Sequence, residues 1–281
     1  MRKGSVKLIS ERIVYDVHTH IFPDKLAERA VGNIGKYYGI PMGCTGTAET
    51  LEENLIKLPN MKFVVSSAAL KEESMKAAND FLLEEAAKRP SFIPFSSFYP
   101  YISVSDAETE LVRVKERGTK GIKLHPDFQK FYIDDPHVIE IYGICEQLGL
   151  PILFHVGDVN TDYSTPTRVY NVTNKLPRLK IIAAHLCGYS VWDEAEKVLI
   201  GTDVYTETSD AMLGLEPDRI VDLIRKHGVD KVMFGSDYPL ASSADIFRQF
   251  DSLPLTEEEK EKIYRTNAEK LFFGIPETSE I

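Results

Sequence analysis

Residues 121–156 read GIKLHPDFQKFYIDDPHVIEIYGICEQLGLPILFHV, and they contain one full repeat of the pattern that decides the fold. The stretch begins and ends with short, mostly apolar runs, Gly121–His125 and Pro151–Val156. Between them, Asp135–Leu148 carries apolar residues at the i, i+3 and i+4 spacing of an amphipathic helix, with Asp135 as a good N-cap. The stretch therefore predicts two strands joined by a crossover helix.

The same alternation extends along the whole chain. Strand-like runs begin about every 30 residues, which is the length of a βα unit. Helical patterns cover Ser74–Arg89, Asp106–Arg117 and Glu216–His227, and Asp106 is the expected N-cap of the second. The eight predicted strands are Ile13–His18, Lys62–Leu70, Phe92–Phe98, Gly121–His125, Pro151–Val156, Lys180–His185, Asp203–Thr208 and Lys231–Ser236. This pattern favours an α/β fold with one domain over residues 1–281, a (β/α)8 TIM barrel; an open parallel sheet is the alternative.

Two segments depart from the regular repeat. The connection from Ile21 to about residue 60 is too long for a simple βα unit and carries five glycines, so we expect it to form a flap over one end of the barrel. The tail, Thr256–Phe273, predicts a closing helix with Thr256 as N-cap, three glutamates in its first turn and Gly274 after its end.

Composition restricts the class of protein. The chain has 281 residues, 43% of them hydrophobic, and a formal net charge of −10, which argues against a nucleic-acid partner. No apolar stretch reaches the roughly 18 residues of a membrane span, and the N-terminus lacks the features of a signal peptide. The three cysteines, Cys44, Cys145 and Cys187, imply no disulfide framework. We therefore expect a cytoplasmic protein without a membrane partner.

Histidines and a carboxylate follow several of the predicted strands. They are His18 and His20, His125, His155, His185 and Asp237. Buried parallel strands are usually apolar throughout, and barrel active sites lie at the carboxyl ends of the strands. Each residue alone has an ordinary explanation, such as a satisfied buried histidine or a helix N-cap. Together they predict convergence on one space.

The residue types indicate the kind of site. Imidazoles and a carboxylate, without thiolates, suit a catalytic divalent ion better than a structural one. Zinc is the expected ion, with manganese or iron as alternatives. His18 and His20 lie two residues apart, so on a strand they share a face and can bind one cation.

The chain resembles the amidohydrolase-related family of the amidohydrolase superfamily, in the branch that contains aminocarboxymuconate-semialdehyde decarboxylase. The blocks that carry the resemblance appear in the order of the family and cover nearly the whole chain. They are DVHTHIFP at 16–23, GIKLHPDFQ at 121–129, PILFHVG at 151–157, IIAAHLCG at 181–188, FGSDYP at 234–239 and NAEKLF at 267–272.

The resemblance implies roles for individual residues. It makes His18, His20 and His155 metal ligands, and Asp237 both a ligand and the group that handles the proton. It makes His185 a catalytic residue that orients the attacking water or polarises the scissile group. Lys123 lies where some binuclear members carry a carboxylated lysine that bridges two metals. We expect one metal per chain, with Lys123 unmodified.

The sequence leaves three interpretations of the function. The first interpretation is a metal-dependent hydrolase that acts on a small, acidic substrate through a metal-activated water, with Asp237 as general base. The alternative is a metal-dependent decarboxylase of an aromatic or enoic acid, and a catalytically silent metabolite-binding barrel is the third. The predicted substrate contacts are Lys123, His125, Tyr205 and Glu207, whereas Asp158 and Arg168 are interpreted as surface charges. A homo-oligomer is left open.

Overall fold

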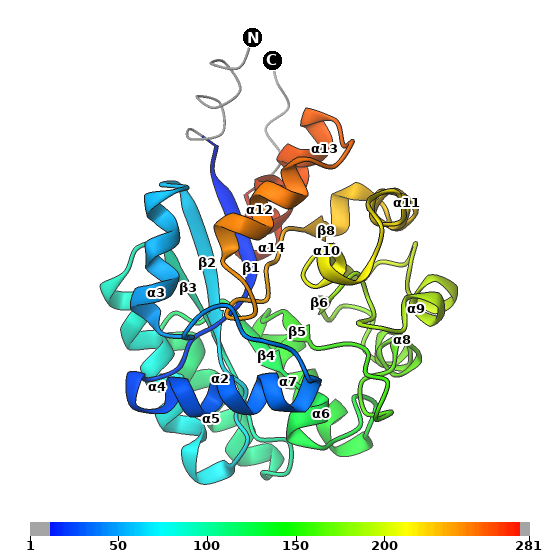
Figure 1. Ribbon diagram of the computed structural model, residues 1–281. Helices are drawn as coiled ribbons and strands as arrows, with labels where there is room; N and C mark the ends of the chain where they lie inside the picture. Colours follow the sequence, from blue (N-terminus) through cyan, green and yellow to red (C-terminus); the bar gives the residue numbers. More distant parts are fainter. Residues whose placement is uncertain (1–11, 276–281) are drawn as a thin grey trace.

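The computed structural model describes residues 12–275, and its eight strands are all parallel and follow one another in chain order around the sheet. Figure 1 shows the strands at the centre and the helices around them. The predicted (β/α)8 barrel is confirmed. The strands are β1 (Val14–His20), β2 (Met61–Ser66), β3 (Phe92–Ser96), β4 (Gly121–Leu124), β5 (Ile152–Phe154), β6 (Ile181–Ala183), β7 (Tyr205–Glu207) and β8 (Val232–Met233).

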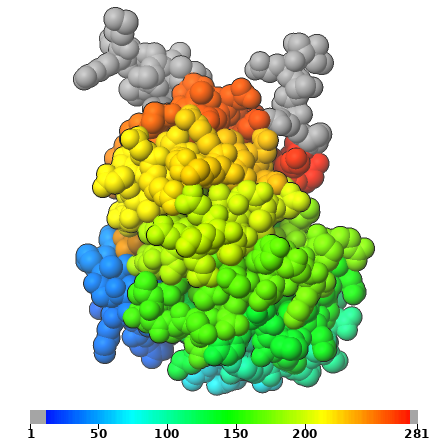
Figure 2. Space-filling view, turned by 90° about the vertical axis from the view of Figure 1, so that its right-hand side faces the viewer, coloured from blue at the N-terminus to red at the C-terminus, as the bar shows by residue number. Residues whose placement is uncertain are grey.

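Helices fill every interval between the strands, and further helices follow β8. The longer ones are α2 (Asp24–Tyr38), α4 (Glu72–Lys88), α5 (Val104–Glu116), α7 (Pro136–Leu148), α8 (Pro166–Lys175), α11 (Pro217–His227) and α12 (Ser243–Asp251). The shorter ones are α3 (Ala48–Glu52), η1 (Glu53–Ile56), α6 (Pro126–Gln129), α9 (Trp192–Val198), α10 (Ala211–Gly214) and η2 (Val229–Lys231). Figure 2 shows one face of the molecule, formed in large part by the green to yellow stretch of the chain that contains α8 to α11. Within residues 12–275, no helix is long and apolar enough to cross a bilayer.

The barrel closes where β1 meets the segment after β8. Backbone hydrogen bonds join Val17 N to the oxygen of Phe234 at 2.9 Å and His20 N to the oxygen of Tyr238 at 2.7 Å. The buried carboxylate of Asp16 also accepts hydrogen bonds from Ser236, 3.0 Å from its backbone nitrogen and 2.6 Å from its Oγ. These bonds hold two predicted sources of metal ligands, β1 and the loop at Asp237, against each other.

Most predicted helix ends are confirmed. The side chain of Asp135 caps α7, Gly149 ends it in the left-handed conformation, and Thr256 forms a capping box with Glu259. The prediction of Asp106 as an N-cap is wrong, because α5 starts earlier and Ser103 Oγ accepts from the backbone nitrogen of Asp106 at 3.1 Å.

The closing helix at the end of the chain is helical throughout, but its hydrogen bonding changes along its length. It runs from α13 (Glu257–Glu261) through a π-helical turn, η3 (Lys262–Thr266), into α14 (Asn267–Phe273). Gly274 ends it in the left-handed conformation, as predicted.

The long first connection, which the sequence predicts to be a flap over one end of the barrel, is folded into helices. It contains α2, α3 and η1, and two of its glycines, Gly32 and Gly35, lie inside α2. Gly39 ends α2 in the left-handed conformation, with φ of 69°. The connection thus brings α2 to the barrel. Tyr38, the last residue of α2, reaches the site described below.

The interior of the barrel is apolar away from the site. One buried cluster draws side chains from β1, β2, β3, β5, β6 and β8, and from α14. Because a single cluster touches so many strands, it fills the inside of the barrel, with α14 packed against it. Tyr205 packs on this cluster, so it belongs to the apolar interior rather than to the polar end of the barrel.

Candidate metal and substrate site

The strand ends bring the predicted polar residues to one end of the barrel. They come from β1, β4, β5, β6, β7 and the loop after β8, and all lie at or just beyond the carboxyl end of the strand. They are His18, His20, Lys123, His125, His155, His185, Glu207 and Asp237. Tyr205, the remaining predicted substrate contact, is not among them.

A register shift in β1 helps to place the two histidines. Asp16 pairs with Phe63 and Thr19 with Val65, so three steps along β1 match two steps along β2. Such a bulge rotates the following side chains relative to a regular strand. Asp16 consequently bonds to Ser236 at the seam, while both His18 and His20 point to the site.

The donor atoms of three predicted metal ligands lie close together. His18 Nε2 lies 3.1 Å from His20 Nε2 and 3.3 Å from Asp237 Oδ1, and His20 Nε2 lies 3.2 Å from the same oxygen. Metal–ligand bonds of about 2.0–2.2 Å place neighbouring donors about 3.0–3.6 Å apart. The separations therefore fit a single divalent ion bound by these three residues. The side chains of His20 and Asp237 are 13% and 23% exposed, so solvent reaches the three ligands from the side of these two residues.

The protonation of His18 also suits a metal. Burial lowers the pKa of His18 well below its ordinary value, which keeps the imidazole neutral. Its Nδ1 lies 2.9 Å from Glu207 Oε1, which can only accept, so Nδ1 carries the proton. The lone pair of His18 Nε2 can then accept, and in the structure the Nζ of Lys123 lies 2.8 Å from it.

Glu207 lies beneath the metal-ligand group and does not face open space. Its side chain is fully buried, and besides His18 it accepts hydrogen bonds from the backbone nitrogens of His185 at 3.0 Å and Ser209 at 2.6 Å. A Cβ on Gly235 would approach its Oε2 to 2.0 Å, so only glycine fits there. Every contact holds the carboxylate in place. Glu207 thus positions His18, and the substrate-binding role predicted for it has no support in this geometry.

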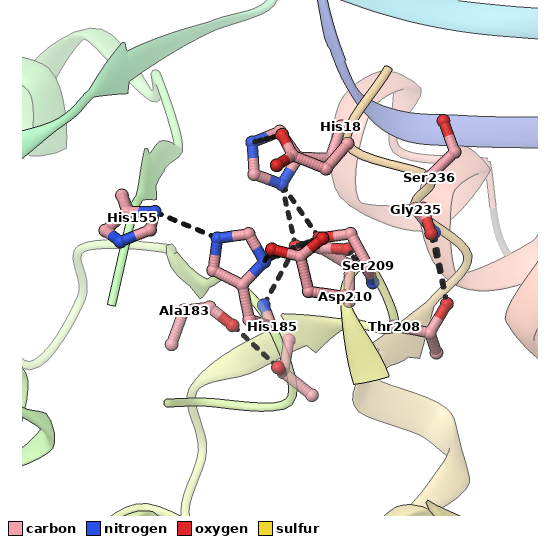
Figure 3. A network of polar contacts seen from close by, with 12 residues as sticks. His18, His155, Ala183, His185, Thr208, Ser209, Asp210, Gly235 and Ser236 are labelled. Carbon is pink, nitrogen blue, oxygen red and sulfur yellow. Dashed lines mark hydrogen bonds and ion pairs between the residues drawn. The ribbon is translucent and has the colours of Figure 1, made fainter. Parts of the chain in front are cut away.

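His185 and His155 form a hydrogen-bonded pair next to this group (Figure 3). His155 Nε2 lies 2.9 Å from the carbonyl oxygen of Gly157, which can only accept, so Nε2 carries the proton. His155 Nδ1 therefore accepts from His185 Nε2 at 2.9 Å. Both nitrogens of His155 are engaged, and it does not join the three-donor group. Its role as a fourth ligand requires the ring to turn and stays a prediction.

Two residues beyond β7 complete the surroundings of His185. Ser209 Oγ lies 2.8 Å and Asp210 Oδ2 lies 3.3 Å from His185 Nδ1. Burial, together with the charges of Asp237 and Glu207, raises the pKa of Asp210 well above its ordinary value. Sequence reasoning missed both residues, although they directly follow Glu207 in the polar run ETSD.

Lys123 is fully buried beside the metal-ligand group. Its Nζ lies 2.8 Å from His18 Nε2. Burial lowers the pKa of Lys123 to about 8, against the nearby charges of Asp237 and Glu207, which raise it. The ammonium form therefore still predominates at neutral pH. It gives the site a fixed positive charge beside the metal-ligand group.

A second polar group lies beside the first and was only partly predicted. His125, Asp127 and His155 place potential ligand atoms within 4.8 Å of one another. The hydroxyl of Tyr38, from α2, lies 3.1 Å from His125 Nε2 and 3.3 Å from His155 Nε2. Asp127 follows His125 by two residues and could have been identified from the sequence. Tyr38 could not, because it precedes β4 by more than 80 positions and no strand-end signal marks it.

The two residues interpreted as surface charges differ in the structure. Arg168 pairs with Asp134 and Asp162 away from the site, as that interpretation predicts. Asp158 is buried and accepts a hydrogen bond from the hydroxyl of Tyr37 at 3.0 Å, so the interpretation is wrong for this residue. The cysteines are all free thiols, as expected.

Comparison with known proteins agrees with the resemblance seen in the sequence. The family model described as amidohydrolase matches residues 15–274. The γ-resorcylate decarboxylase of Rhizobium sp. is 24% identical over 251 residues, an alignment that covers 71% of this chain and 76% of that protein.

Solved structures share the fold at lower sequence identity. A dihydroxybenzoic acid decarboxylase from Polaromonas sp., with bound manganese and the inhibitor 2-nitroresorcinol, superposes with a TM-score of 0.68 at 19% identity, covering 93% of this chain and 97% of that one. A 5-carboxyvanillate decarboxylase from Novosphingobium aromaticivorans, complexed with manganese, gives a TM-score of 0.70 at 16% identity, covering 94% and 96%. At these identities the likeness shows the fold alone.

Proposed function

Because the chain belongs to the amidohydrolase family, we propose that it is a metal-dependent decarboxylase of a small aromatic acid. The observation that carries this proposal is the three-donor group of His18, His20 and Asp237 with the buried ammonium of Lys123 beside it. A divalent cation bound by the three donors and the neighbouring ammonium would together supply the positive charge that binds a carboxylate substrate.

The comparisons favour decarboxylation, the alternative interpretation of the sequence, over hydrolysis. The curated relatives are γ-resorcylate decarboxylases, and structural neighbours act on dihydroxybenzoate or carboxyvanillate. The two reactions differ in the bond that breaks and in whether water is consumed. Decarboxylation breaks the bond between the ring and the carboxyl carbon, leaves the electron pair on the ring and adds a proton there, and it consumes no water.

We propose manganese as the ion in place of the zinc expected from the sequence. Manganese is the metal in the two related structures, and two imidazoles with a carboxylate suit Mn²⁺, Fe²⁺ and Zn²⁺ alike. A bound divalent ion would supply positive charge to hold the substrate oxygens and to stabilise negative charge that develops on the ring.

The chain's own residues would bind the acid and move the proton. Lys123 would pair with the substrate carboxylate, since its ammonium is desolvated and lacks a carboxylate within salt-bridge distance among the described residues. The new proton on the ring would come from one of two residues at this end of the barrel: His185, or Asp237 after its carboxylate has taken a proton from the incoming acid or from water. The burial of His185 excludes water from its side of the site.

Two further expectations stay predictions. The free thiols of Cys44, Cys145 and Cys187 support a cytoplasmic location, where such thiols remain reduced. The partner that we propose is a small-molecule acid rather than a macromolecule.

The proposal is tested by a product screen. Purified protein loaded with Mn²⁺ is incubated with hydroxybenzoates, carboxyvanillate, lactones and amides, and CO₂ release and hydrolysis products are followed together. We expect CO₂ release from at least one hydroxylated benzoate, with an equal amount of the phenol. Hydrolysis of an amide or lactone without any CO₂ release would restore the hydrolytic interpretation.

A further inference from the structure

We propose that residues 32–42, the second half of α2 and the loop after it, form a lid that must swing open before a substrate can reach Lys123. The inference rests on the proposed function for the identity of the substrate alone. Its tests measure how fast a small reagent and solvent reach the covered residues. They can therefore succeed or fail whatever reaction the product screen finds.

The innermost residues of the site are closed to solvent. Lys123 and His185 are both 0% exposed. A substrate carboxylate can contact the Lys123 ammonium only after it has entered this closed space. Solvent reaches the metal ligands His20 and Asp237, but Lys123 stays covered, so part of the protein has to move.

Tyr38 covers the site from outside the barrel strands. Its hydroxyl lies 3.1 Å from His125 Nε2 and 3.3 Å from His155 Nε2, and its ring lies 5.5 Å from that of Tyr189, nearly perpendicular to it. Tyr189 is fixed, because its backbone nitrogen donates to the oxygen of Val156 at 2.8 Å. Of these two rings over the histidines, the one on α2 is therefore the one that can move.

The lid makes few buried contacts. Every residue from 32 to 45 is at least partly exposed, whereas the first half of α2 has two buried residues. Two tyrosine side chains tie the lid to the barrel, that of Tyr38 and that of Tyr37, whose hydroxyl donates to Asp158 Oδ2 at 3.0 Å. Segments with little buried apolar surface open at a lower free energy than the rest of a protein. The lid is such a segment.

Glycines provide the hinge and keep the lid in one piece. Gly32 lies within α2 and lines an open groove of about 590 Å³, and apart from the local helix backbone no atom lies within 4 Å of the place of a Cβ. A Cβ on Gly35 would come within 2.9 Å of the oxygen of Ile40, so the end of α2 packs directly on the loop and moves with it. The backbone nitrogen of Gly43 donates to the oxygen of Leu240 at 2.8 Å, which holds the far end. The lid can therefore turn as one body between Gly32 and Gly43.

Modification of a thiol at position 123 tests the lid. Metal-free Lys123→Cys protein is treated with methyl methanethiolsulfonate, and modification of each cysteine is followed by mass spectrometry. We expect position 123 to react at least about tenfold faster than Cys145, which is buried in α7 and becomes accessible only when the barrel unfolds. A rate as slow as that of Cys145 would mean that no local opening exposes Lys123, and it would overturn the inference.

Gly32→Ala in the same protein shows whether α2 is the part that opens. Alanine is favoured over glycine within a helix, so the substitution stabilises the closed lid and should slow the reaction at position 123 about fivefold. The matched control is Gly143→Ala in α7, where an added Cβ likewise meets no atom within 4 Å and the rate should not change. Equal rates in the two variants would place the entry past His20 and Asp237 and overturn the inference.

Amide hydrogen exchange covers the case in which Lys123→Cys does not fold. The exchange of residues 33–38 is compared in wild type, Gly32→Ala and Gly143→Ala. We expect it to be about fivefold slower in Gly32→Ala and unchanged in Gly143→Ala. Tyr37→Phe, which loses one tie to the barrel, should speed the exchange several-fold. Exchange that Gly32→Ala does not slow would overturn the inference.

Discussion

The carboxylate of Glu207 lies 2.9 Å from Nδ1 of His18 and thereby turns the other ring nitrogen toward His20 and Asp237. The pair joins the end of β7 to β1, the two strands on either side of β8 where the barrel closes. A histidine ligand commonly depends on such a partner for its tautomer and orientation. This relationship makes the metal-ligand group sensitive to a residue outside it.

Glu207→Gln should weaken manganese binding. The substitution replaces one carboxylate oxygen by an NH₂ group and removes the negative charge. The new NH₂ group then faces an N–H group, of either His18 or Ser209, that donates a hydrogen bond to Glu207 in wild type. Loss of such a partner typically costs about 10–100-fold in metal affinity. Calorimetric titration of Mn²⁺ into this variant and into the surface control Glu196→Gln would measure it. Unchanged affinity in a folded Glu207→Gln protein would show that Glu207 does not position His18.

Asp237→Asn should lower turnover by at least about 100-fold, the lower range of what a general acid or base contributes. Two imidazoles remain, so we expect manganese to bind more weakly rather than not at all. Steady-state CO₂ release by the Mn²⁺-saturated variant is the measurement. Turnover near that of wild type would assign the proton to His185 instead.

Lys123→Met should separate substrate binding from metal binding. Methionine preserves the unbranched chain but removes the ammonium beside His18 Nε2. We expect KM for the acid to rise at least about tenfold, while wild type and variant both bind one Mn²⁺ per chain. Two ions in wild type and one in the variant would instead indicate a carboxylated lysine that bridges a metal pair.

His227 should make the metal-free protein lose stability in acid. It is buried in α11, its Nε2 lies 2.8 Å from the oxygen of Val204, and burial lowers its pKa to about 4. The unfolded chain, with a pKa of about 6.5, binds more protons between pH 6.5 and 4, so the free energy of unfolding falls as pH decreases through that range. At pH 4.5 this contribution should be about 2–3 kcal/mol lower than at pH 7.5.

Denaturant unfolding of wild type and His227→Gln at the two pH values isolates this effect. The variant is expected to be the less stable protein at pH 7.5, with a smaller difference at pH 4.5. A difference that stays the same at both pH values would mean that the pKa of His227 is not lowered in the folded state.

The fold was predictable because the barrel repeats one local pattern. Runs such as Pro151–Val156 and helices such as Asp135–Leu148 carry their periodicity in neighbouring residues. The ends of the strands then place His18, His20 and Asp237 together by topology alone. The rest depends on contacts that no local pattern encodes. The buried role of Glu207 depends on the distance to a histidine 189 positions away, and Tyr38 reaches His125 only because α2 folds back over the barrel.

Local backbone detail explains the remaining differences. The register shift in β1 sends Asp16 to the seam, although simple alternation would place it on the same face as His18. Ser209 and Asp210, in the polar run after Glu207, contact His185, and Asp210 adopts the left-handed conformation, with φ of 57°. Tyr205 shares a strand face with Glu207, as alternation predicts, but it lies one layer deeper, among apolar side chains.

The most direct test of a single catalytic metal ion is CO₂ release as a function of the ratio of Mn²⁺ to protein, with a substrate such as 2,6-dihydroxybenzoate and metal-free protein as the starting point. We expect no release without metal, a linear rise to one equivalent and a plateau beyond it. We also expect that His20→Ala, which removes one of the three donors, shows little release at the same ratios. Full activity in rigorously metal-free protein, or undiminished activity of His20→Ala at one equivalent, would contradict a metal-dependent reaction at this group.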